Sequence, residues 1–179
     1  MLNLFLPNKH VQSIYDITPT MLKELGIKGV VVDLDNTLVP WNVADATEEV
    51  RIWLDHLRKA GLYVFVFSNN NESRVKRFAE PLQIPYLANA RKPLLKSFRY
   101  VKKKMGISPG QLAVIGDQVL TDVFGGNRFG AYTILVRPIV NSDGPATKIN
   151  RQIEKLILNY FYRRGKLIRS VVDDEQTSM

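Results

Sequence analysis

The chain has 179 residues, a formal net charge of +8 and no cysteine. The lack of cysteine excludes disulfide bonds and thiolate metal sites, and two histidines are too few for an imidazole-based zinc centre. The length suits a single domain with a substantial core, and no apolar run is long enough to span a bilayer. The excess of positive charge favours anionic partners, namely nucleic acid, phosphorylated metabolites or an acidic membrane surface, without choosing among them.

Residues 1–27 are predicted to form a lead-in of loop and one short helix. Thr18 with Pro19 is a typical helix start, and Gly26 is a typical stop. The next stretch, 29–32, is a β-branched apolar run that predicts a strand buried on both faces. We expect the rest of the chain to be arranged around this strand.

Two carboxylates, Asp33 and Asp35, follow this strand directly, and the hydroxyl of Thr37 comes next. Uncompensated carboxylates beside an apolar core are costly, and open parallel sheets bind ligands where their strands end. We therefore expect a divalent cation to compensate the pair, and oxygen ligands make Mg²⁺ the expected ion. Taken alone, the same residues also fit an ordinary turn after a strand, because Asp and Asn are favoured in turns.

The remaining predicted elements alternate between helix and strand. In chain order they are a helix from 45 to 60, a strand at 63–67, a short helix around Val75 and Phe78, a short strand at 85–88, a basic helix at 92–105, a strand at 112–117 that ends in an acid, a helix at 121–129 and a strand at 132–136. Such alternation implies a doubly wound, mainly parallel α/β sheet with right-handed crossovers, which is a Rossmann-like fold.

Three further polar stretches accompany these elements. Ser68 and Asn69 follow one buried strand, Lys92 opens the basic helix, and Asp117 and Asp122 follow another strand. Each stretch alone has an ordinary structural explanation, such as a turn, a solvated lysine, or an acid that complements a helix dipole. Four signals in order, at the ends of separate strands, are far more specific than any one of them.

Together the four stretches resemble the motifs of the haloacid dehalogenase (HAD) superfamily of phosphotransferases. Residues 31–37, Val-Val-Asp-Leu-Asp-Asn-Thr, resemble its first motif, and the resemblance covers about residues 28 to 137. Within the superfamily, residues 33–41 and 116–118 resemble the bacterial YqeG-type branch of subfamily IIIA, which is related to the mitochondrial-type phosphatidylglycerophosphate phosphatases. The resemblance implies a single HAD domain and a phosphatase activity.

The resemblance also implies a role for each acidic residue. Asp33, which is ionised near neutrality, would be the nucleophile that forms an aspartyl-phosphate. Asp35 would be the general acid and base, and its backbone carbonyl would bind Mg²⁺. Asp117 would bind the metal together with Asp33. Asp122 would not bind the metal directly but would support the residues that do, or would act through a water molecule.

The residues that would hold the substrate phosphate follow from the same motifs. Thr37, Ser68 and Asn69 would donate hydrogen bonds to phosphate oxygens. Lys92 would bind the phosphate and offset the charge on Asp33. Arg91 is a competing candidate for this role, and the sequence leaves that choice open.

The spacing of the motifs bears on the substrate. Neither gap between motifs leaves about 50 residues for an inserted cap domain, so we expect a site open to lipid head groups, nucleic-acid ends or phosphoproteins. From Lys148 to Arg169 the chain has seven basic residues and one acid. This segment predicts an amphipathic helix that closes the sheet, attraction to anionic lipid, or both. Its predicted apolar face consists of Ile149, Ile153, Leu156, Ile157 and Tyr160.

The expected function is a Mg²⁺-dependent phosphatase whose substrate, by the branch resemblance, is phosphatidylglycerophosphate. We expect a cytoplasmic protein that contacts the inner face of the membrane peripherally and binds no nucleic acid. The alternatives are a phosphatase of a soluble nucleotide, sugar phosphate or phosphoprotein, and a non-catalytic module that binds RNA or protein.

The expected layout is one domain over 1–179, with a core at 28–137, a basic segment at 145–169 and a disordered tail at 170–179. The sequence does not indicate an oligomeric state.

Overall fold

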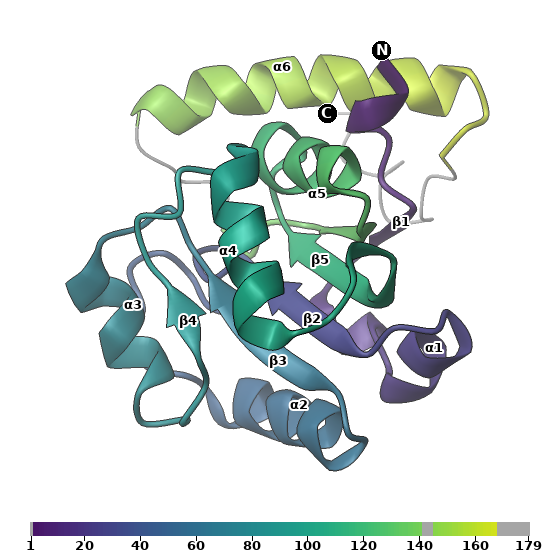
Figure 1. Cartoon of the computed structure of the whole chain (residues 1–179). Helices are drawn as coiled ribbons and strands as arrows, with labels where there is room; N and C mark the ends of the chain where they lie inside the picture. Colours follow the sequence, from purple (N-terminus) through teal and green to yellow (C-terminus); the bar gives the residue numbers. More distant parts are fainter. Residues whose placement is uncertain (1, 141–144, 168–179) are drawn as a thin grey trace.

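The computed structural model describes residues 2–140 and 145–167, in which a six-stranded sheet has helices on both faces (Figure 1). The strand order is β1-β6-β5-β2-β3-β4, and all five neighbouring pairs are parallel. The strands are β1 (Lys9–Val11), β2 (Gly29–Val32), β3 (Tyr63–Phe67), β4 (Tyr86–Leu87), β5 (Leu112–Gly116) and β6 (Tyr132–Val136). The predicted doubly wound α/β fold is confirmed.

Strand β2 lies in the middle of the sheet, and all four of its residues are buried. Because successive side chains of a strand point to opposite faces, Val30 and Val32 pack into one apolar cluster and Val31 into another. The main-chain N–H of Asp33 donates to the carbonyl of Ile115 at 2.9 Å, so pairing with β5 continues past the end of β2. Asp33 is thereby held at the carboxyl edge of the sheet.

The helices complete two layers around the sheet (Figure 1). The helical segments are η1 (Leu2–Phe5), η2 (Ile14–Asp16), α1 (Pro19–Glu24), α2 (Glu48–Lys59), α3 (Glu72–Ala79), α4 (Leu95–Met105), η3 (Pro109–Gln111), η4 (Val119–Val123), α5 (Phe124–Phe129) and α6 (Pro145–Arg163). The first apolar cluster packs α1, α2 and α3 against one face, and the second packs α4 against the other. Within the described residues, no helix combines the length and the apolar character needed to cross a membrane.

Two parts of the predicted element order need correction. The lead-in contains a strand, β1, which pairs with β6 at the edge of the sheet. The basic helix begins at Leu95 rather than at Lys92. The reason is Pro93, because a residue that precedes proline is disfavoured in helical conformation. Lys92 therefore belongs to a loop, from which its side chain can reach the acids at the carboxyl ends of the strands.

The C-terminal helix α6 is present, and Ile157 packs as predicted, but three other residues of its predicted packed face do not. Ile157 and Leu158 pack against η4, and Phe161 is fully buried. Ile153, Leu156 and Tyr160 are exposed, Leu156 at 71%. The helix is turned so that the buried Glu154 accepts a hydrogen bond from the N–H of Leu120 at 3.0 Å. The side chain of Ile149 and the tail at 170–179 lie outside the described residues.

Candidate active site

The predicted site residues meet at the carboxyl edge of the sheet. Asp33 follows β2, Ser68 follows β3 and Asp117 follows β5, and these three strands are neighbours. A hollow of about 320 Å³ opens between them. It is lined by Asp33, Asp35, Ser68, Asn69, Asn70, Lys92, Gln118, Thr121 and Asp122. Most of the residues predicted from the motifs thus line one polar hollow.

A buried lysine joins two of the acids. The Nζ of Lys92 lies 2.6 Å from Asp33 Oδ1 and 2.7 Å from Asp122 Oδ1. Burial alone would lower the pKa of Lys92, but Asp122 and Asp33 outweigh that effect and raise it, so the side chain stays a cation. Arg91, the competing candidate, is exposed and has a left-handed backbone with φ +55°. The structure therefore places Lys92, and not Arg91, in the site.

Thr37 links the acids that follow β2 and β5. Its Oγ1 lies 3.4 Å from Asp33 Oδ2 and 3.3 Å from Asp117 Oδ1. Asn36 makes this possible, because its positive φ of 63° turns the chain directly after the acid pair, and asparagine tolerates that conformation. Asp33, Asp117 and Asp122 each offer an oxygen, and the three oxygens lie within 4.8 Å of one another.

Burial shifts the pKa of two of these acids, Asp33 and Asp117. Burial raises the pKa of Asp33, and Lys92 opposes the rise. Burial likewise raises the pKa of Asp117, with Arg151 as the main opposing group. Gly116 permits the crowding, since a Cβ at that position would overlap the carboxyl group of Asp122. The site thus holds three carboxylates at a cost that nearby cations reduce.

Asp35 is held by two residues that the sequence analysis did not single out. Arg74 places its Nε 3.1 Å and its Nη2 2.9 Å from Asp35 Oδ1. Asn70 donates from Nδ2 to Asp35 Oδ2 at 3.0 Å. The available signal for Arg74 was its place in the first turn of α3, the helix that follows Ser68. Both oxygens of Asp35 are therefore fixed at the wall of the hollow.

Ser68 and Asn69 occupy the predicted position but differ in what their side chains do. Ser68 is buried, and its Oγ accepts the N–H of Asn70 at 3.1 Å. Asn69 accepts the N–H of Lys92 at 2.6 Å and donates to the carbonyl of Lys92 at 3.2 Å. The side chain of Asn69 thus fixes the backbone of Lys92, which leaves its main-chain N–H for the predicted phosphate contact.

Helix α6 adds a second pair of residues that the motifs did not indicate. Arg151 donates from Nη1 to the carbonyl of Asp117 at 2.7 Å, and its Nη2 contacts Asp117 Oδ2. Its Nη1 also lies 3.3 Å from Glu154 Oε2. Burial raises the pKa of Glu154 to about 7. No spacing rule connects Arg151 with an acid 34 positions earlier in the chain, so the sequence held no signal for this contact.

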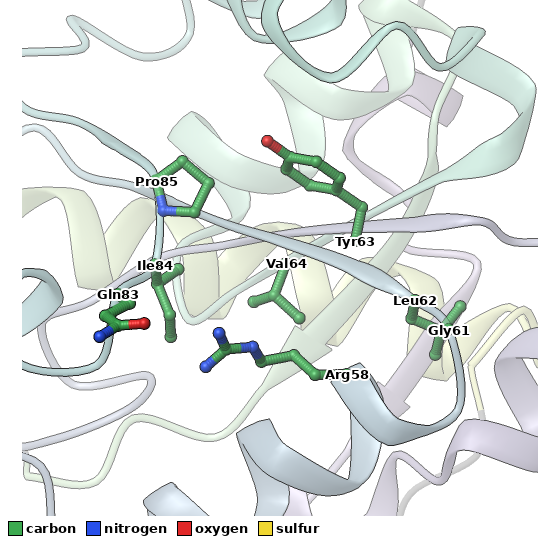
Figure 2. Close-up of a pocket in the computed structure, with 8 residues that line it drawn as sticks. All are labelled: Arg58, Gly61, Leu62, Tyr63, Val64, Gln83, Ile84 and Pro85. Atoms are coloured by element: carbon green, nitrogen blue, oxygen red, sulfur yellow. The ribbon is translucent and has the colours of Figure 1, made fainter.

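A second hollow, of about 410 Å³, lies at the amino end of β3, away from the carboxyl ends of the strands (Figure 2). Figure 2 shows Tyr63 and Val64 on opposite sides of the strand, with Arg58 on the Val64 side. Among its eight described lining residues, Arg58 is the one charged side chain, and its Nη1 donates to the carbonyl of Leu82 at 3.0 Å. This hollow lacks the grouped acids of the carboxyl edge.

Comparison with known proteins gives similarities over most of the chain. A family model described as mitochondrial PGP phosphatase matches residues 2–141. The probable phosphatase YqeG of Bacillus subtilis is 48% identical over 163 residues, which are 91% of this chain and 95% of that protein. Phosphatidylglycerophosphate phosphatase 1 of Arabidopsis thaliana is 29% identical over 171 residues, 89% of this chain; the chain spans about half of its length, 49%.

Among solved structures, the fold is similar to that of the cobalt-bound deoxy-D-mannose-octulosonate 8-phosphate phosphatase of Haemophilus influenzae. The TM-score is 0.54 and the sequence identity is 18%. The match covers 76% of this chain and 90% of that one. At this identity the likeness bears on the fold alone.

Proposed function

Because the chain belongs to the mitochondrial PGP phosphatase family and is a HAD-type phosphatase, we propose that it hydrolyses the phosphate monoester of phosphatidylglycerophosphate to give phosphatidylglycerol. The observation that carries the proposed chemistry is the buried Lys92 ammonium between Asp33 and Asp122, with Thr37 linking Asp33 to Asp117. Residues from three separate segments thereby form one charged centre, as phosphoryl transfer requires.

Asp33 is the proposed nucleophile. One of its oxygens forms a bond to phosphorus while the bond from phosphorus to the leaving glycerol oxygen breaks, and Asp35 gives that oxygen a proton. Asp35 then takes a proton from a water molecule whose oxygen attacks the aspartyl-phosphate. Inorganic phosphate leaves, and both carboxyl groups return to their starting states. Arg74 and Asn70 keep Asp35 at the wall of the hollow for both transfers.

The transferred phosphoryl group needs positive charge and hydrogen-bond donors. Lys92 supplies the charge from a fixed position, because Asn69 holds its backbone at both the N–H and the carbonyl. The hydroxyls of Ser68 and Thr37 and the main-chain N–H of Asn69 are the proposed donors to phosphate oxygens. Asp122 orients Lys92 through its 2.7 Å contact with the ammonium.

The donor set fits a magnesium ion. Three carboxylate oxygens lie within 4.8 Å of one another, and burial raises the pKa of Asp33 and Asp117, so a cation among them would relieve their repulsion. Carboxylates are the ligands that Mg²⁺ prefers. Asp33, Asp117 and the main-chain carbonyl of Asp35 would hold the ion. When bound, it would neutralise charge on the phosphoryl group and on the acids around it.

The surroundings of the site support a lipid substrate. Four connections that leave the carboxyl ends of β1, β2, β4 and β6 each carry an exposed apolar side chain: Tyr15, Trp41, Leu94 and Ile139, which are 47% to 55% exposed. Such side chains around a polar hollow suit contact with the interfacial region of a bilayer. The proposed location is the cytoplasmic surface of a membrane, where the net charge of +8 favours anionic lipid.

The experiment is a phosphate-release assay on a panel of substrates. Phosphatidylglycerophosphate in mixed micelles is compared with p-nitrophenyl phosphate, a nucleotide and a sugar phosphate, each in Mg²⁺ and in EDTA. We expect the lipid to be the best substrate, with turnover that requires Mg²⁺ and that is lost in Asp33→Asn. An acid-quenched reaction should yield a hydroxylamine-sensitive phosphoryl group on Asp33.

The outcomes separate the parts of the proposal. Turnover of soluble esters but not of the lipid would refute the substrate and leave the phosphatase chemistry standing. Unchanged rates in EDTA would refute the role of the metal. A lack of turnover on every ester, together with salt-dependent binding of RNA by both wild type and Asp33→Asn, would favour the binding-module alternative.

A further inference from the structure

Helix α6 brings a cation to the site from outside the segment that carries the four motifs. The guanidinium of Arg151 donates to the main-chain carbonyl of Asp117 at 2.7 Å and contacts the Oδ2 atom of the same residue. We propose that Arg151 is a positioning residue that fixes the Asp117 carboxylate in the orientation that binds a divalent cation. This inference rests on the proposed function, since it assumes that Asp117 is a metal ligand.

The two carboxylate oxygens of Asp117 face different partners. Oδ2 is held by Arg151, whereas Oδ1 lies 3.3 Å from Thr37 Oγ1, which itself lies 3.4 Å from Asp33 Oδ2. Oδ1 is therefore the oxygen on the side of Asp33. Because Arg151 holds both the main chain and Oδ2, it restricts rotation of the carboxylate. Hydrogen bonds of this kind commonly orient a ligating carboxylate.

Glu154 makes the arrangement compatible with a nearby metal ion. A guanidinium close to a divalent cation would repel it. Glu154 Oε2 lies 3.3 Å from Arg151 Nη1, three positions away on the same helix, and offsets that charge. The other oxygen of Glu154 accepts the N–H of Leu120, which ties α6 to the segment that follows Asp117. The pair thus contributes geometry, and above the Glu154 pKa of about 7 it carries little net charge.

The contact also couples the position of α6 to occupancy of the metal site. If Arg151 favours the metal-binding orientation of Asp117, then metal binding must favour the docked position of α6 by the same free energy. The helix is also held by Ile157, Leu158 and the buried Phe161, by the hydrogen bond from Leu120 to Glu154, and by the contact between His10 and Tyr162. Amide hydrogen exchange in α6 should therefore be slower in Mg²⁺ than in EDTA, and this difference should shrink in Arg151→Gln.

The direct test is calorimetric titration of the full chain with Mg²⁺ alone. Wild type is compared with Arg151→Gln, Arg151→Lys, Asp117→Asn and the control Lys155→Gln. Lys155 is exposed one turn further along α6, so its variant removes the same charge from the same helix. We expect Arg151→Gln to weaken Mg²⁺ binding about 10–100-fold. Arg151→Lys should fall between it and wild type, because lysine lacks the planar fork, and Lys155→Gln should match wild type.

Each outcome decides the question. Wild-type affinity in Arg151→Gln would overturn the inference, and tighter binding would show that Arg151 competes with the ion for Asp117. If Asp117→Asn binds Mg²⁺ like wild type, the proposed metal site itself fails; if Asp117→Asn loses binding while Arg151→Gln does not, the positioning role alone fails. Thermal unfolding in EDTA distinguishes the positioning role of Arg151 from a purely structural one. A purely structural role would lower the melting temperature of Arg151→Gln without changing its Mg²⁺ affinity. Should Arg151→Gln not fold, wild-type affinity in Arg151→Lys would overturn the inference, and an affinity about threefold lower or weaker would support it.

Discussion

Replacing Lys92 with methionine removes the cation on which the site's acids depend. The ammonium lies 2.6 Å from Asp33 Oδ1 and 2.7 Å from Asp122 Oδ1, and its side chain is 3% exposed. Removing one partner of a buried ion pair costs about 3–5 kcal/mol, because the other charge stays buried without compensation. In a chain of this length 1 kcal/mol shifts the melting temperature by about 2–4 °C. We therefore expect Lys92→Met to unfold about 6–20 °C below wild type in EDTA, with no phosphatase activity.

The assay is thermal and urea unfolding at pH 8 in EDTA, with Lys96→Met as the matched control. Lys96 is exposed, four positions later, and its variant removes the same charge. A surface substitution of this kind should change the free energy of unfolding by at most about 0.5 kcal/mol. If Lys92→Met unfolded together with Lys96→Met, the buried ammonium could not be what holds Asp33 and Asp122 together, and the account of the site would be refuted.

Three further variants probe other contacts of the site. Arg74→Met frees one oxygen of Asp35 and should lower kcat at least about tenfold in a protein that still folds; unchanged kcat would contradict the positioning of Asp35. Gly116→Ala places a Cβ against the carboxyl of Asp122 and should cost about 1–3 kcal/mol in urea unfolding. Burial raises the pKa of Glu154 to about 7 from an ordinary value of 4.5, so the folded chain keeps a proton that the unfolded chain releases, and stability falls as pH rises through this window. Asp33 and Asp117 contribute to the same fall because their pKa values are raised too, so Glu154→Gln should reduce that slope in unfolding curves measured from pH 4.5 to 8; an unchanged slope would show that Glu154 does not contribute to it.

The sheet could be predicted largely because its central strands are continuous apolar runs. Strands β3 and β6 have the predicted limits, and β2 and β5 end directly before the acids that they position. Strand β1 was missed because Lys9–Val11 has neither an apolar run nor a clear alternation, and its extended form depends on pairing with β6. Pairing of this kind is a tertiary contact, which local sequence does not encode.

The site was predictable where its chemistry follows the strands and was not predictable where helices supply it. Asp33 and Asp117 sit at strand ends, so their meeting follows from the topology of a parallel sheet. Arg74 and Arg151 reach the acids from α3 and α6, and no periodic pattern fixes such distances. The predicted face of α6 was wrong at Ile153, Leu156 and Tyr160. Polar contacts of Arg151 and Glu154 set the rotation of the helix, whereas the prediction used apolar spacing alone.

The most direct test of the central claim is the initial rate of phosphate release by wild type and by Asp33→Asn, measured side by side in Mg²⁺ on the best substrate of the panel. If Asp33 is the reacting carboxylate, its near-isosteric amide should lower kcat about 10³-fold or more while the variant stays folded. A folded Asp33→Asn protein with turnover within tenfold of wild type would place the chemistry on another residue and contradict the account.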